Sequence, residues 1–232
     1  LDSTHAHFYR VISSLVANYG AVICPVVIPY IENDEVKSYI DLITNKAYAC
    51  DGLELKELRM PVSNEADEMR SMLLEAIATA DDALMEKYFA GEEFTPEEII
   101  EGLKKGVTAG EICPVFAGVQ QTGAAVPLMV DTLLQILPSA ADAVCRFEDG
   151  EEKAFDENGE NALFVFKTIA DPFVGKLSYV KVVSGKITAD TELYNMRTGN
   201  VERLGKMLHT RGKKQEETTV ISAGDIGAIT KL

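Results

Sequence analysis

The stretch that decides the fold of this chain is residues 164–185, FVFKTIADPFVGKLSYVKVVSG. Two apolar-rich runs flank a polar segment that contains Asp171-Pro172, a pattern typical of two strands joined by a turn. Short runs of period two lie near residues 162–169, 176–184, 192–196, 201–208 and 226–231. Turn residues separate them at Ser184-Gly185, Thr198-Gly199-Asn200 and Gly224-Asp225. Strands this short and this regularly spaced predict a barrel or sandwich over residues 162–232.

The N-terminal part of the chain begins with a helix and a small sheet. Residues 8–19 have apolar side chains at helical spacing, and Gly20 follows them as a C-cap. A strand is predicted at residues 22–28, where Pro25 favours an edge position or a bulge. Alternating runs at residues 36–44, 47–50 and 53–60 then predict antiparallel strands, and Asp51-Gly52 favours a tight hairpin between the last two.

More helices and one further strand follow. Residues 63–89 carry an apolar stripe that predicts a helix, and a capping box at Thr95-Pro96-Glu97-Glu98 predicts the start of another. The apolar run 112–116 predicts a strand buried on both faces, and residues 126–137 predict a helix that ends before a proline. Strand, loop and helix in this order form the βα unit of an α/β domain, which we assign to residues 1–137.

The charge of the chain divides it in two. The net charge is −15, but residues 1–160 carry 30 Asp and Glu against 11 Lys and Arg, whereas residues 161–232 carry 7 against 11. The acidic and polar segment 138–161 is interpreted as a linker. A basic C-terminal module would be drawn to a phosphate backbone, although a simple solvated surface would carry the same charges.

Composition limits the class of protein. A length of 232 residues fits one or two domains, and an apolar content of 47% is ordinary for a globular chain. No apolar run approaches the roughly 18 to 20 residues of a membrane helix, and no signal peptide opens the chain. The cysteines never form a Cys-x-x-Cys pair, which predicts free, buried thiols at Cys24, Cys50, Cys113 and Cys145.

Motifs that would carry catalysis are missing from the sequence. There is no G-x-x-x-x-G-K-[ST] loop for phosphate and no arrangement of Ser, His and Asp or of Cys and His that predicts a nucleophile. His5 and His7 stand beside a helix start without other ligands at matching spacing, so a surface pair is favoured over a metal site. We therefore expect no metal in this chain, and the residues by themselves do not describe an enzyme.

Several segments resemble elongation factor G and its relatives, the ribosome-bound GTPases of translation. Residues 164–185, and Asp171 to Leu177 above all, resemble the start of the second domain of that family, and residues 223–229 resemble a later strand pair. Residues 82–89, 91–93 and 103–106 resemble the helical half of the subdomain inserted into its GTPase domain, here residues 21–111. Residues 113–116 resemble the strand before the family's second guanine loop.

This resemblance implies a fold and a function. The fold is α/β, a partial GTPase domain with an α+β insert over residues 1–137, followed after the linker by an all-β translation-factor barrel that is incomplete at Leu232. The intact protein would be a ribosome-binding GTP hydrolase that uses GTP and Mg²⁺ and acts in translocation. The chain alone would lack catalytic residues and bound cofactors. The alternatives are a ribosomal protection or release-factor-type GTPase and a non-catalytic ribosome-binding module.

The resemblance also implies residues of a nucleotide site. Asp2 matches the last position of the family's Asn-Lys-x-Asp motif, whose carboxylate accepts the two N–H donors of guanine. An Asp before a helix is equally a simple N-cap. Gly118, Val119 and Gln120 stand where the family usually has Ser-Ala after a glycine and contacts the base through a backbone N–H. The departure at these positions indicates a paralogue of the main factor.

Partners follow from the same resemblance. The barrel would meet ribosomal RNA of the small subunit, and the inserted subdomain would meet stalk proteins. The cations assigned to the RNA contact are Lys176, Lys206, Arg211, Lys213 and Lys214. The alternative is that Glu216 and Glu217 neutralise the last four of these and that they face only solvent. We expect a cytoplasmic monomer without membrane contact.

Overall fold

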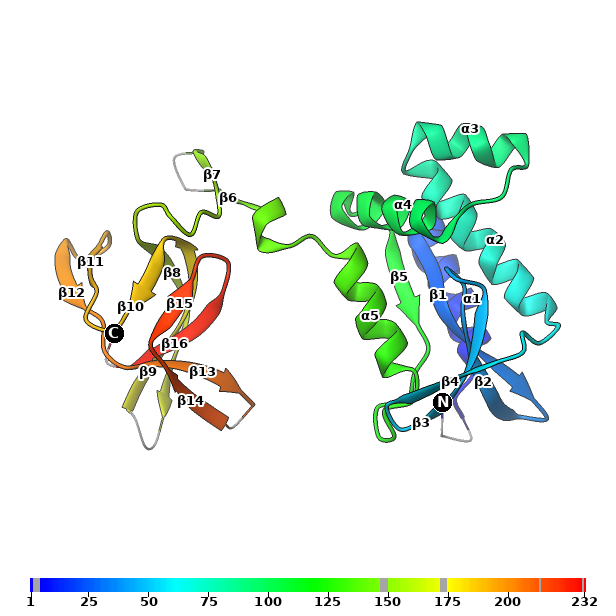
Figure 1. Ribbon diagram of the computed structural model, residues 1–232, viewed down its shortest axis with the longest axis horizontal. Coiled ribbons are helices and arrows are strands. Elements are labelled where there is room, and N and C mark those ends of the chain that lie inside the picture. Colours follow the sequence, from blue (N-terminus) through cyan, green and yellow to red (C-terminus); the bar gives the residue numbers. More distant parts are fainter. Residues whose placement is uncertain (2–4, 147–149, 172–174, 213, 231) are drawn as a thin grey trace. The chain divides into compact units, whose positions relative to one another are not determined.

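The computed structural model describes residues 1, 5–146, 150–171, 175–212, 214–230 and 232. The chain divides into two compact units, Leu1–Leu137 and Pro138–Leu232, and each is described by itself (Figure 1). No helix within these described ranges is long and apolar enough to cross a bilayer.

A five-stranded sheet with the order β4-β3-β2-β1-β5 forms the centre of the first unit. The strands are β1 (Ile23–Glu32), β2 (Glu35–Asp41), β3 (Lys46–Asp51), β4 (Glu54–Leu58) and β5 (Cys113–Phe116). The first four are antiparallel neighbours, and β5 runs parallel to β1. Asn33 and Asp34 join β1 to β2 with φ of 54° and 61°, as a type I′ turn requires, so the small antiparallel sheet is confirmed.

The described part of the first unit also contains five α-helices and one short 3₁₀ turn. They are α1 (Phe8–Tyr19), η1 (Gly20–Val22), α2 (Asn64–Thr79), α3 (Asp82–Ala90), α4 (Pro96–Ala109) and α5 (Val126–Ile136). Helix α2 packs on β1 and against α4, and α4 also contacts β5 and α5 (Figure 1). The capping box predicted at Thr95 is confirmed, because Thr95 Oγ1 accepts from the Glu98 N–H and Glu98 Oε2 accepts from the Thr95 N–H.

The prediction of one helix over residues 63–89 is wrong, because the chain breaks between α2 and α3. The carboxylate of Asp81 accepts from the backbone N–H groups of Ala83 and Leu84 and so caps α3. A capping carboxylate satisfies donors that would otherwise point back into a preceding turn, which favours a new start over a continuous helix.

Two expectations about strands have different outcomes. Pro25 lies in β1, which has neighbours on both sides, and a register shift between Pro25 and Val27 accommodates the missing donor as a bulge. The expectation that 112–116 is buried on both faces is wrong. Strand β5 ends the sheet, Cys113 is exposed and its next three residues are only partly buried, because this edge strand keeps part of its surface open to solvent.

The core of the first unit is made from one face of each helix and the inner part of the sheet. Its fully buried members include Val27, Ile28, Ile40, Leu73 and Leu103. All four cysteines of the chain are free thiols, as predicted, but burial was predicted correctly only for Cys24. Burial raises the pKa of the Cys24 thiol to about 12, which keeps it protonated.

The second unit consists of strands, as predicted, and its sheets do not close into a complete barrel among the described residues. The main sheet has the order β14-β13-β16-β9-β8. Its strands are β8 (Ala162–Asp171), β9 (Gly175–Ser184), β13 (Met207–Arg211), β14 (Lys214–Thr218) and β16 (Ile226–Thr230). Two-stranded pairs are β10 (Lys186–Thr188) with β15 (Val220–Ser222), and β11 (Glu192–Asn195) with β12 (Asn200–Arg203). Apolar side chains are buried on both faces of the main sheet, around Val180 on one and Leu177 on the other.

The segment 138–161 contains regular structure of its own. It holds η2 (Ala140–Asp142) and a hairpin of β6 (Val144–Arg146) and β7 (Glu152–Ala154). Lys181 Nζ of β9 lies 4.7 Å from the centre of the Phe155 ring, and Asp156 pairs with Ser184. These contacts attach the end of the segment to the second unit.

Candidate functional site

The predicted guanine loop follows the carboxyl end of β5. The Ala117 N–H donates to the Val27 carbonyl at 2.7 Å, which extends the β1–β5 pairing by one residue before the chain turns away. Residues 118–125 form the loop, and α5 begins directly after it. In sheets with parallel strands and helical crossovers, ligands bind outside the carboxyl ends of the strands, so this loop lies where a nucleotide site is expected.

Hydrogen bonds inside the loop decide which of its backbone donors remain open. The Val119 N–H donates to the Ala124 carbonyl at 3.0 Å, and the Gly123 N–H donates to the Val119 carbonyl at 2.9 Å. Val119 is buried, whereas Gly118 and Gln120 are exposed. Of the three N–H groups assigned to the base, that of Val119 is thus already used within the loop. Those of Gly118 and Gln120 make no hydrogen bond within the part of the chain that the structure describes.

The loop is closed by backbone conformations that few residues adopt. Gly123 has φ of +78°, and Ala125, which precedes the first turn of α5, has φ of +62°. The side chain of Leu53, at the tip of the β3–β4 hairpin, lies beside Gly123. No pattern in the sequence predicts this neighbour of the loop, and the only local signal is the pair of glycines Gly52 and Gly123.

The carboxylate predicted to read the guanine edge, Asp2, lies outside the described residues. His5 and His7, close to it, are exposed. Within the described ranges, no three side chains of His, Cys, Asp or Glu come together as metal ligands would.

The described cations among those predicted to contact RNA lie in β9 and in or beside the β13–β14 hairpin. Arg211 ends β13 and stands directly opposite Lys214, which begins β14. Lys206 precedes β13, so it lies about 17 Å from Arg211 along the strand. Lys176, near the start of β9, is exposed. Lys213 lies outside the described residues. The structure therefore brings Arg211 and Lys214 together at one hairpin and separates Lys206 from them.

Two of these cations are paired with carboxylates. Lys206 Nζ lies 2.5 Å from Glu217 Oε1, and Arg211 Nη2 lies 3.7 Å from Glu216 Oε1. Both pairs are largely exposed, so each is worth little and can be exchanged for a phosphate contact. Lys176 and Lys214 make no ion pair with the described residues. Glu217 and Glu216 thus neutralise Lys206 and Arg211, respectively, whereas Lys214 keeps its charge unpaired among the described residues.

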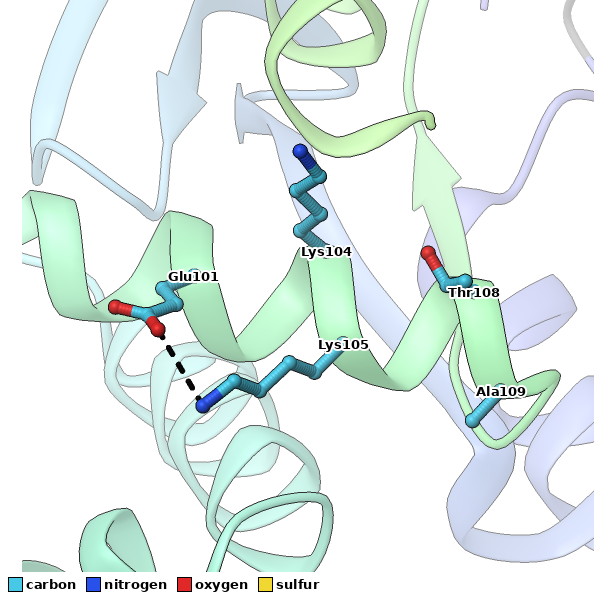
Figure 2. Close-up of a pocket in the computed structure, with 5 residues that line it drawn as sticks. All are labelled: Glu101, Lys104, Lys105, Thr108 and Ala109. Atoms are coloured by element: carbon cyan, nitrogen blue, oxygen red, sulfur yellow. Dashed lines mark ion pairs between the residues drawn. The ribbon is translucent and has the colours of Figure 1, made fainter. Parts of the chain in front are cut away.

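An open depression of about 510 Å³ lies on α4. Figure 2 shows its lining residues, Glu101, Lys104, Lys105, Thr108 and Ala109. Glu101 and Lys105 face each other one turn apart with 3.3 Å between Oε1 and Nζ, and Lys105 also lies 2.5 Å from Asp81 Oδ2. The lining residues include no nucleophile with an adjacent base, and Lys105 is engaged in ion pairs, so the depression offers no catalytic arrangement.

The chain is similar to known proteins in its C-terminal part and in its overall fold. Residues 160–232 match the family described as Elongation factor G domain 2. The chain is also similar to the crystal structure of a protein from Thermus thermophilus, over 97% of its length, with 26% sequence identity and a TM-score of 0.77. It spans 32% of the length of that Thermus chain. Residues 160–232 are therefore similar to domain 2 of elongation factor G, and the chain as a whole is similar in fold to part of the Thermus protein.

Proposed function

We propose that the full-length protein containing this chain is a GTPase that binds the ribosome and acts in translocation during protein synthesis. The observation that carries the proposal is the match of residues 160–232 to domain 2 of elongation factor G. The likeness to the Thermus structure extends over both units and supports the same assignment for residues 1–137. The protein would work in the cytoplasm as a monomer.

In this proposal, the first unit supplies part of the guanine site. The backbone N–H groups of Gly118 and Gln120 are exposed at the carboxyl end of β5 and would donate to the base carbonyl. Asp2 would accept the N–H donors of the guanine edge. The described residues contain no cluster that would hold Mg²⁺. The groups that position the phosphates, the metal and the attacking water would come from parts of the protein outside this chain.

The second unit would supply the contact with ribosomal RNA. Lys176 and Lys214 are exposed cations that have no carboxylate partner among the described residues, and Arg211 can exchange an exposed, 3.7 Å pair for a phosphate. Phosphate contacts of this kind give most of the affinity of a protein for RNA and make it depend on salt. The acidic first unit would be repelled by RNA, so any ribosomal partner of its insert would be a protein, such as those of the stalk.

The test uses the full-length protein with purified ribosomes. We expect GTP hydrolysis that ribosomes stimulate, and movement of messenger RNA by one codon on pre-translocation ribosomes. Absence of stimulated hydrolysis would rule out the GTPase assignment. Stimulated hydrolysis without messenger movement would rule out translocation and favour a protection or release role. The 232-residue chain alone serves as the control for contaminating GTPases.

A further inference from the structure

The tip of the β3–β4 hairpin is in van der Waals contact with the second half of the loop after β5. Gly52 and Leu53 form the two-residue turn, and Gly52 has φ of +59°. A methyl group on Gly123 would lie 3.0 Å from Cδ2 of Leu53, and one on Gly52 would lie 3.7 Å from the Thr122 carbonyl oxygen. Two glycines thus allow the hairpin and the loop to approach closely. The hairpin therefore touches the loop at two neighbouring residues, Thr122 and Gly123.

The loop transmits this restraint to its first half. Gly123, which contacts Leu53, donates to the carbonyl of Val119, and the next residue, Ala124, accepts the hydrogen bond from the Val119 N–H. Val119 lies between Gly118 and Gln120, whose N–H groups are the open donors. Any displacement of residues 122–125 would move Val119 and change the direction of both donors.

We propose that the β3–β4 hairpin is a positioning element for the guanine loop, in which Leu53 fixes the arrangement that presents the Gly118 and Gln120 N–H groups to the base. This inference rests on the proposed function. Loss of the contact between Leu53 and Gly123 would loosen the loop and speed the release of the nucleotide.

The test compares Leu53→Ala with Leu53→Met and with Leu58→Ala in the full-length protein. Leu58 lies at the far end of β4, away from the hairpin tip, so its truncation is a matched control. Release of a fluorescent GDP analogue should become about 3 to 10 times faster in Leu53→Ala, a coupling of ordinary size. Leu53→Met and Leu58→Ala should stay within about twofold of wild type. Because Leu53 is 68% exposed, the unfolding midpoint should change little.

A second measurement separates this inference from the proposed function. Amide hydrogen exchange of residues 118–125, without nucleotide, should be faster in Leu53→Ala than in wild type or Leu58→Ala. Unchanged exchange would overturn the positioning role whether or not nucleotide binds. Faster exchange with unchanged GDP release would overturn the coupling to nucleotide. Failure of the wild-type protein to bind GDP would overturn the proposed function, while the exchange result would still decide whether the hairpin holds the loop.

Discussion

Lys214 should be the cation of the β13–β14 hairpin that contributes most to ribosome binding. Arg211 and Lys206 are held by Glu216 and Glu217, and each must give up that partner before it contacts a phosphate. Lys214 has no such partner among the described residues. Replacing Lys214 with Ala therefore removes a cation without releasing a carboxylate. Replacing Arg211 alone would also expose the charge of Glu216, which would repel RNA.

The magnitude follows from counterion release. Each phosphate contact adds about 0.7 to 0.9 to the slope of log K against log salt concentration. Losing one contact should therefore lower the slope by that amount, so that the affinity difference between wild type and Lys214→Ala shrinks about threefold between roughly 50 and 200 mM salt. The free energy of unfolding should change by less than about 0.5 kcal/mol, because Lys214 is exposed on an edge strand.

The assay is co-sedimentation of the full-length protein with ribosomes over a series of salt concentrations. Arg211→Ala combined with Glu216→Ala leaves the net charge unchanged and should lower the slope less than Lys214→Ala does. Lys56→Ala, an exposed lysine of β4, removes the same charge from the acidic unit and should leave the slope unchanged. If Lys214→Ala had the slope of wild type, the hairpin would not contact RNA, and the assignment of this edge would be wrong.

Three further outcomes are expected. Gly106→Ala should lower the free energy of unfolding by about 1 to 3 kcal/mol in urea titrations, because the new methyl group would lie 2.5 Å from Cγ1 of Ile112 and closer still to Cδ1, which outweighs the better helix propensity of Ala. The hydrogen bonds from Lys105 and from the α3 backbone hold the pKa of Asp81 below its ordinary value of 3.8. Asp81→Asn should therefore lower the free energy of unfolding at pH 7, and the difference from wild type should disappear as the pH falls through the folded pKa of Asp81. A difference in unfolding free energy that stayed constant throughout an acid titration would contradict this cause. The 232-residue chain with ribosomes should show no GTP turnover above ribosomes alone, and stimulated turnover would place the phosphate site within this chain.

Local signals in the sequence predicted most of the elements. Alternating patterns and turn residues predicted β1–β4 of the first unit and β8, β9, β11 and β16 of the second, and the capping box at Thr95 fixed the start of α4. The predicted strand 201–208 is wrong, because the chain is divided there into β12 and β13, and β10, β14 and β15 were not predicted. The spacing of apolar residues did not predict the break between α2 and α3, because the apolar stripe continues through Asp81, where α3 begins with its own N-cap. The apolar run at residues 112–116 likewise did not predict the burial of β5 correctly, since such a run does not show that its strand lies at the end of the sheet.

The candidate nucleotide loop shows why part of a site lies beyond sequence reasoning. The resemblance located Gly118, Val119 and Gln120, but a backbone N–H exists at each position and the residue types do not tell which one is open. Which N–H group is open depends on the hydrogen bond from the Val119 N–H to the Ala124 carbonyl, which forms only when the loop closes. Closure depends in turn on Leu53, which reaches Gly123 because the fold brings the β3–β4 hairpin beside the loop that precedes α5. The sequence indicates such a contact only through its glycines, because the close approach of two segments leaves no room for a side chain on one of them. A glycine does not identify the segment that lies against it.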